Sequence, residues 1–174
     1  VLVCGLSNSY TAGDTSYGDI VTTDRVGSAG YNSSGDYTSS FSGTSAAAPE
    51  ISGIVALMLE ANPNLGYRDV QEILALTARN TDATESWTIN GSGTWNGGGM
   101  HANRDVGYGL VDAHAAVRLA ETWTNQSTAA NELQATAKAA PNQAIPNGGQ
   151  AVTSQVTITD AVSVERAEVV LDID

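Results

Sequence analysis

Ser45 is the side chain of this sequence whose neighbours best suit nucleophilic chemistry. It lies between Gly43-Thr44 and three alanines that lead into Pro49, and the apolar residues that follow predict a helix. A serine attacks a carbonyl only when a base removes its proton and hydrogen-bond donors receive the developing oxyanion. At a helix N-terminus, unpaired backbone N–H groups and the helix dipole favour negative charge. The pattern therefore predicts a nucleophile at the start of a helix, with an ordinary N-cap at Ser45 or Thr44 as the alternative.

The other reactive side chains have simpler interpretations. Cys4 is the single cysteine, which excludes an internal disulfide, and its apolar neighbours favour an inert core thiol over a nucleophile. His101 lies in a Gly-rich loop and His114 in a predicted helix, and we interpret both as surface or loop residues. A serine-before-histidine order suits an α/β-hydrolase, but that fold needs a G-x-S-x-G motif, which GTSAA does not supply.

Metal binding is weakly indicated by the residues themselves. Asp14, Asp19, Asp24 and Asp36 in the long polar loop can supply oxygens to calcium, but turn formation is the favoured interpretation. The sequence contains no H-E-x-x-H motif, cysteine pair or EF-hand spacing. We therefore assign no metal ligand.

Three helices are predicted around the serine. The first runs from Ser45 to Ala61, and its apolar residues are dense enough to predict burial on most of its faces. The second covers Tyr67 to Ala78, and the third runs from its N-cap Asp112 to about Trp123. Short strands are predicted at residues 1–5, 20–23 and 37–38.

The composition changes after the third helix. Residues 124–150 are rich in Ala, Asn and Gln and include two prolines, which predicts a linker. The segments QVTITD and VSVERAEVVLDID then alternate apolar and polar residues, as half-buried antiparallel strands do. Because two strands do not make a stable sheet alone, we interpret residues 151–174 as the start of a second, all-β domain.

Charge and hydropathy restrict the classes of partner. The net charge is −12 and Lys138 is the only lysine, whereas nucleic acids and anionic membranes require a basic surface. We therefore expect neither nucleic acid nor membrane as a partner. The longest apolar stretch, residues 51–59, is far shorter than the roughly 20 residues that cross a bilayer. The acidic charge itself is interpreted as serving solubility or salt tolerance.

Several motifs together resemble one family. FSGTSAAAPEISGIVALMLEANPNL resembles the nucleophile helix of subtilisin-like serine proteases, and more closely that of their kexin/furin-like branch. The start of the next helix, YRDVQ, and the later GYGLVDA are similar to segments of the same catalytic domain. The segment IVTTD resembles the stretch before the nucleophile, so that the resemblance covers roughly residues 1–123. Glu50 after the proline departs from furin itself.

The resemblance implies roles for individual residues. Ser45 matches the nucleophile, its backbone N–H matches one oxyanion donor, and Thr44 matches a residue that supports the oxyanion hole. In the family order, the triad Asp, the triad His and the oxyanion Asn come before the serine, and here they would precede Val1. The chain alone is therefore expected to be inactive. Calcium is also implied by the family, with its ligands mostly upstream.

The fold class implied by the resemblance is α/β and subtilisin-like: a parallel sheet with a buried nucleophile helix, incomplete at its N-terminus. Residues 1–123 would be the C-terminal part of the catalytic domain, followed by the linker and the first strands of a β-sandwich P domain. The protein would be secreted or at the cell surface, and would hydrolyse polypeptides through an acyl-enzyme on Ser45, with cleavage after basic residues suggested. Its partner would be the N-terminal portion of the catalytic domain. The alternative is a non-catalytic subtilisin-like scaffold that binds at a surface.

Overall fold

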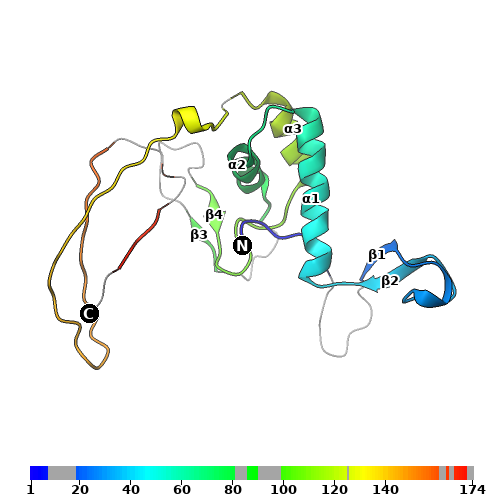
Figure 1. The fold of residues 1–174 in the computed structure, drawn as a ribbon, viewed down its shortest axis with the longest axis horizontal. Coiled ribbons are helices and arrows are strands. Elements are labelled where there is room, and N and C mark those ends of the chain that lie inside the picture. Colours follow the sequence, from blue (N-terminus) through cyan, green and yellow to red (C-terminus); the bar gives the residue numbers. More distant parts are fainter. Residues whose placement is uncertain are drawn as a thin grey trace. The chain divides into compact units, whose positions relative to one another are not determined.

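The computed structural model describes residues 1–7, 19–80, 86–89, 99–124, 126–160, 164 and 167–171. The chain forms two compact units, Val1–Ser127 and Thr128–Asp174. The first unit contains the three α-helices of the described residues, which lie together in Figure 1. Asp14 lies outside the described residues.

The three helices follow the sequence prediction closely. They are α1 (Thr44–Ala61), α2 (Tyr67–Thr77) and α3 (Ala113–Thr122). Their shared core consists of Met58, Leu65, Val70, Ile73, Leu74, Ala116 and Ala120. The alanines of α3 let that helix approach α1 and α2 closely, so that Met58 and Ile73 are completely buried.

Polar side chains join the helix ends around this core. Asn62, the residue after α1, donates from Nδ2 to the carbonyls of Ala120 and Trp123, both at 3.0 Å, at the end of α3. Asp69 at the start of α2 is fully buried, and its carboxylate accepts N–H groups of Gly66 and Ser127 at 2.7 Å and indole Nε1 of Trp123 at 3.2 Å. Because the last carbonyls and the first N–H groups of a helix lack intrahelical partners, these side chains satisfy them.

The sheets in the described residues are small. β1 (Ile20–Thr23) and β2 (Tyr37–Phe41) form an antiparallel hairpin with Thr22 opposite Thr38, and β2 runs directly into α1 (Figure 1). A second antiparallel pair joins β3 (Thr88–Ile89) to β4 (His101–Ala102). The short 3₁₀ turns η1 (Gly27–Ala29) and η2 (Ala129–Asn131) complete the elements.

The predicted N-terminal strand is reduced to one bridge. Cys4 pairs in parallel with Leu110, and Leu110 pairs on its other side with Arg79. The segments can approach this closely because Gly107 and Gly109 both have positive φ, and a Cβ on either would lie within 2.3 Å of a backbone oxygen of Leu2 or Arg79. Among the described residues, this bridge is parallel, whereas the β1–β2 and β3–β4 pairs are antiparallel.

The described residues of this chain differ from two expectations from the sequence. α1 is not buried on most faces in this chain: Leu57 and Leu59 are 50% and 39% exposed, because α2 and α3 cover only the side that carries Met58. The described residues after 150 form no strand, and Val156, Ile158 and Val169 are exposed there. A period of two specifies which side chains share a face, but a strand also needs a hydrogen-bonded neighbour.

Candidate active site

The start of α1 is set by a glycine. Gly43 is the N-cap, with φ 82° and ψ −178°, a backbone conformation that is essentially restricted to glycine. Its carbonyl accepts the N–H of Ala46 at 2.9 Å and of Ala47 at 3.3 Å. The N-cap residue is Gly43 and makes no side-chain cap bond, so the alternative that Ser45 or Thr44 is the N-cap is wrong. Thr44 and Ser45 are instead the first two helical residues.

Ser45 is exposed, as expected of a nucleophile that must meet a substrate. No hydrogen bond joins its hydroxyl to any residue in the part of the chain that the structure describes. Its backbone N–H is among the first four of the helix, which have no intrahelical partner, and the dipole of this 18-residue helix favours negative charge at that end. Pro49 lies inside the helix within its first two turns. The local geometry therefore places an exposed hydroxyl and a backbone N–H at the positive end of a helix in one residue.

The N-terminal segment lies against the first two turns of α1. Ser7 Oγ donates to the carbonyl of Gly43 at 3.0 Å, and the N–H of Leu6 donates to Oε2 of Glu50 at 2.9 Å. Between these contacts, a Cβ on Gly5 would lie 2.9 Å from the Ala47 carbonyl oxygen and 3.3 Å from its Cβ. The residues that support the serine thus include a segment almost 40 positions away in the sequence.

The contacts described for the other candidate groups are made with residues other than Ser45. Cys4 is half-buried, and its thiol lies 3.4 Å from the carbonyl of Val106, as expected for a core thiol. The His101 ring contacts Trp87 edge to face at a centroid distance of 4.7 Å, and its Nε2 is buried without a partner among the described residues. His114 is exposed in the first turn of α3. No described hydrogen bond joins either histidine to Ser45.

Asp24 organises turns in the polar loop. Asp24 accepts the N–H of Arg25 at 2.7 Å and of Asn32 at 2.8 Å. These bonds, chiefly the one from Asn32, lower the pKa of Asp24. The backbone N–H of Asp24 donates to the carbonyl of Asp36 at 2.8 Å, which closes the β1–β2 hairpin. Among the described residues, no three His, Cys, Asp or Glu side chains gather as metal ligands, and the resemblance places the calcium ligands mostly upstream.

Asp112 caps α3 as its position in the sequence predicts. Its Oδ1 accepts the N–H of Ala115 at 2.9 Å, and its Oδ2 lies 3.5 Å from Arg79 Nη1. The bond from Ala115, with a smaller contribution from Arg79, lowers the pKa of this carboxyl. This pair has a structural function, since it fixes the start of α3 beside the bridge at Leu110.

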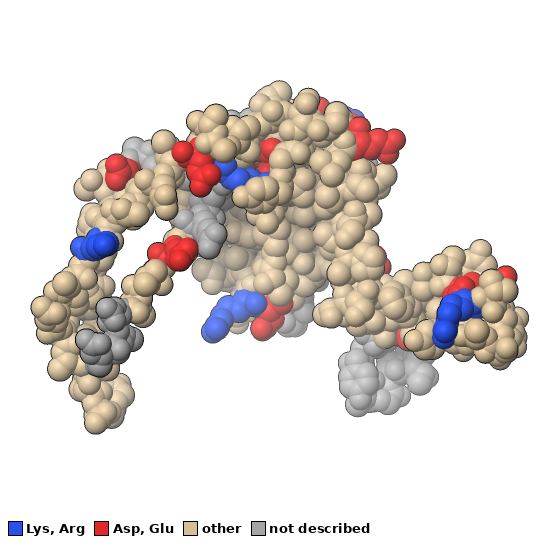
Figure 2. Space-filling view, in the orientation of Figure 1, with Lys and Arg blue, Asp and Glu red and all other residues tan. Residues whose placement is uncertain are grey.

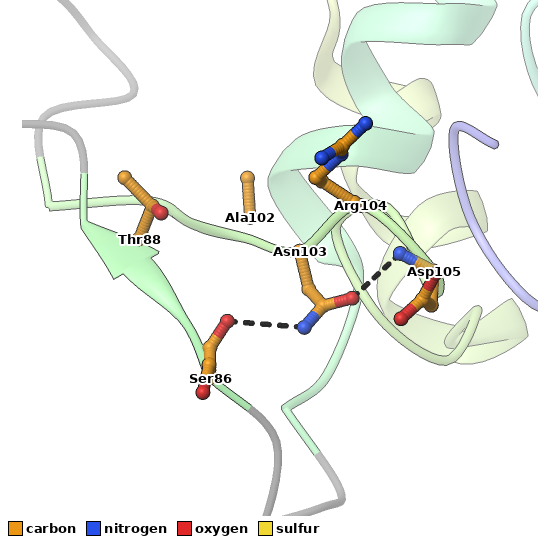
Figure 3. A pocket seen from close by; sticks show the side chains of 6 residues that line it. All are labelled: Ser86, Thr88, Ala102, Asn103, Arg104 and Asp105. Atoms are coloured by element: carbon orange, nitrogen blue, oxygen red, sulfur yellow. Dashed lines mark hydrogen bonds between the residues drawn. The ribbon is translucent and has the colours of Figure 1, made fainter. Parts of the chain in front are cut away.

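A surface depression lies beside β3 and β4. It is lined by Ser86, Thr88, Ala102, Asn103, Arg104 and Asp105 (Figure 3). The Asn103 amide bonds the carbonyl of Ser86 at 3.0 Å and the N–H of Asp105 at 2.6 Å, which folds the loop onto itself. The depression contains no residue of α1. In Figure 2, acidic and basic side chains are scattered over the visible face of the described residues.

Sequence reasoning predicts roles for Ser45 and Thr44 but does not name the residues that contact the first turns of α1. Glu50 was noted only as a departure from furin, and Ser7 carries no local signal. Asn62 before a proline is typical of a helix stop and Asp69 suits the positive end of a helix dipole, whereas both bond residues more than 50 positions away. Side chains of this kind are recognised only once the tertiary contacts are known.

Comparison with known proteins identifies the class to which this fold and site belong. The model of the subtilase family, Peptidase_S8, matches residues 10–109, which is more than half of the chain. The chain belongs to the subtilase family. This confirms the resemblance to the kexin/furin-like branch, because the curated relatives include furins and related endoproteases.

Individual relatives agree with this assignment. Mouse furin is 38% identical over 120 residues, which are 68% of this chain and 13% of furin. A PC3-like endoprotease of Hydra vulgaris is 46% identical over 89 residues, 51% of this chain and 12% of that protein. The crystal structure of a serine protease of Aeromonas sobria has a TM-score of 0.53 and 29% identity, over 64% of this chain and 24% of that chain. The chain thus spans only a small part of the length of its relatives.

Proposed function

We propose that the protein carrying this chain is a serine endopeptidase that hydrolyses peptide bonds through an acyl-enzyme on Ser45. The observation that carries the proposal is the exposed Ser45 in the first turn of α1, where unpaired N–H groups are available to an oxyanion. Membership of the subtilase family supports it, because the family model spans this segment at residues 10–109 and the relatives include furin.

In the proposed reaction, Ser45 Oγ attacks the scissile carbonyl as a base removes its proton, and the backbone N–H of Ser45 donates to the oxyanion. The amine leaves after it is protonated, and water then hydrolyses the acyl-enzyme. The triad Asp and His and the oxyanion Asn belong, in this proposal, to residues that precede Val1. Thr44, exposed beside Ser45, supports the oxyanion hole.

Further properties are proposed from the family resemblance. Polypeptides are the substrates, with cleavage after basic residues, and the protein is secreted or at the cell surface. Residues 124–150 are a linker and residues 151–174 begin a P domain. None of the helices in the described residues has the length and apolar character needed to cross a membrane. The family resemblance implies bound calcium, and no step of the proposed reaction depends on it.

The test uses the complete protein and a fluorophosphonate probe, which phosphonylates activated serines. We expect one adduct by intact mass, located on the peptide that contains Ser45. Ser45→Ala should remove labelling and lower peptide hydrolysis by about 10⁴-fold or more, while the free energy of unfolding changes by less than about 0.5 kcal/mol, as for other exposed positions. Wild-type activity in Ser45→Ala would exclude the mechanism. A correctly folded complete protein that never labels would favour the non-catalytic scaffold.

Thr44→Val gives a second, graded test in the same protein. Because a supporting hydroxyl acts on the transition state, kcat should fall with KM nearly unchanged, and by no more than the roughly 10²–10³-fold that follows removal of one oxyanion donor. An unchanged kcat would exclude the role of Thr44 without affecting that of Ser45.

A further inference from the structure

Glu50 forms a contact that neither the subtilase assignment nor the chemistry at Ser45 accounts for. Its Oε2 accepts the backbone N–H of Leu6 at 2.9 Å, across 44 positions of sequence. Glu50 follows Pro49 and is only partly exposed. It therefore holds an extended segment against α1 five residues after Ser45.

This contact is one of three that follow a single face of the helix. Ser7 Oγ donates to the Gly43 carbonyl at 3.0 Å, and Gly5 packs directly on Ala47. Helical residues 43, 47 and 50 follow the i, i+4, i+7 spacing, which places them along one stripe. The Glu50 side chain points back toward the N-terminus of the helix, as helical side chains do, and this direction lets it reach Leu6.

The stripe lies on the back of the helix relative to the serine. At about 100° per residue, Ala47 and Glu50 are roughly 200° and 140° around the axis from Ser45. The segment can therefore support the first turns without covering the Ser45 hydroxyl. The Gly43 carbonyl that Ser7 contacts is also the acceptor of the first two helical N–H bonds, so any shift of the segment is transmitted to the turn that carries Ser45.

We infer that Glu50, together with Ser7, is a positioning residue for the nucleophile: its carboxylate fixes residues 5–7 behind the first turns of α1 and so fixes Ser45. The inference rests on the proposed function. Gly5 contributes by its size, because any side chain there would meet the Ala47 backbone at 2.9 Å. Glu50 contacts no substrate in this scheme and acts only through the position of the helix.

The test measures kcat and KM of the complete protein on a peptide substrate, together with the rate of fluorophosphonate labelling. A displacement of about 1 Å can cost roughly 10²-fold, and Glu50→Ala removes one of three contacts, so we expect kcat and the labelling rate to fall about tenfold. KM should change by less than about threefold, because substrate binding is not altered. Ser7→Ala should act in the same direction with a smaller effect.

Two variants separate positioning from other effects. In Glu50→Gln the amide oxygen can still accept the Leu6 N–H, so that kcat should stay within about twofold of wild type. Glu60→Ala removes an exposed carboxylate at the other end of α1 and should change nothing. In the Glu50→Ala, Ser7→Ala double variant the loss should be smaller than the product of the single losses, because both contacts hold the same segment.

The outcomes distinguish this inference from the proposed function. If Ser45→Ala is inactive but Glu50→Ala keeps the wild-type kcat, or if Glu50→Gln is as impaired as Glu50→Ala, the positioning role is overturned and the function stands. A loss confined to KM also overturns it. If Ser45→Ala keeps wild-type turnover, both proposals fail. A tenfold fall in kcat in Glu50→Ala with recovery in Glu50→Gln supports the inference.

Discussion

Replacement of Gly43 by alanine tests the geometry at the start of α1 most directly. Gly43 has φ 82° and ψ −178°, and a Cβ built there would have no heavy atom within 4 Å. The substitution therefore introduces no clash within the described residues, and its effect is that of the backbone conformation alone. A non-glycine residue held in such a region costs about 1–3 kcal/mol.

The backbone strain in Gly43→Ala can lower either the free energy of unfolding or kcat. If residue 43 keeps its conformation, the free energy of unfolding falls by the full strain, about 1–3 kcal/mol. If it rotates to relieve the strain, its carbonyl leaves the N–H groups of Ala46 and Ala47 and the hydroxyl of Ser7, and the first turn shifts. Ser45 moves with that turn, and a displacement near 1 Å would lower kcat by roughly 10²-fold.

The assay combines urea unfolding of the complete protein with steady-state kinetics. We expect Gly43→Ala to lose about 1–3 kcal/mol of stability, to lose activity mainly in kcat, or to do both. Gly149→Ala is the matched control, because Gly149 has φ 85° and equally open surroundings but belongs to the second unit; its kcat should stay at the wild-type value. Wild-type stability together with wild-type kcat in Gly43→Ala would refute the argument.

Three further predictions concern the supporting structure. Asp69→Ala should lower the free energy of unfolding of the complete protein by about 2–4 kcal/mol in urea titrations, because three half-buried donors lose the buried carboxylate that accepts them; a change below about 0.5 kcal/mol would contradict it. For Asp112, the lowered pKa means that its stabilisation is present above the usual aspartate pKa and is lost as pH falls through the lowered value. Wild type and Asp112→Ala should therefore differ most near neutral pH and converge in thermal melts below about pH 4. The 174-residue chain expressed alone should self-associate in gel filtration and stay unlabelled by a fluorophosphonate, since α1 exposes Leu57 and Leu59; a monomer that labels at Ser45 would contradict this.

The features that the sequence predicted well are those with local causes. α1, α2 and α3 begin and end within one or two residues of the predicted positions, because caps, helix breakers and apolar spacing act over a few residues. Asp112 was predicted as an N-cap for the same reason and bonds the N–H of Ala115. The sequence did not predict Gly43 as the N-cap of α1, because Ser and Thr are favoured at N-caps. Gly43 takes that place instead through a backbone conformation that serine and threonine rarely adopt.

The features that were missed depend on contacts between distant segments. The bonds of Glu50 with Leu6, Asn62 with Trp123 and Asp69 with Ser127 span 44, 61 and 58 positions. Each of these side chains also has a local interpretation: a solvated charge, a helix stop, a complement to the helix dipole. A local pattern favours such an interpretation, because nothing in it names the distant partner. The contacts of the first turns of α1 are therefore harder to predict than the position of Ser45 at the start of the helix.

The exposed side of α1 depends both on the local sequence pattern and on contacts with distant segments. The helix carries apolar residues around most of its circumference, but only the side with Met58 is covered by α2 and α3. The share of apolar residues predicts how much of a helix surface is suited to burial. How much of it is buried depends on which other elements pack against the helix. In an α/β layer, a helix of this composition packs against a parallel sheet, and the single Cys4–Leu110 bridge is the parallel pairing in the described residues. Leu57 and Leu59 lie on the two sides of α1 that flank Met58, more than three turns after Ser45, and they are exposed positions that the proposed N-terminal portion would cover.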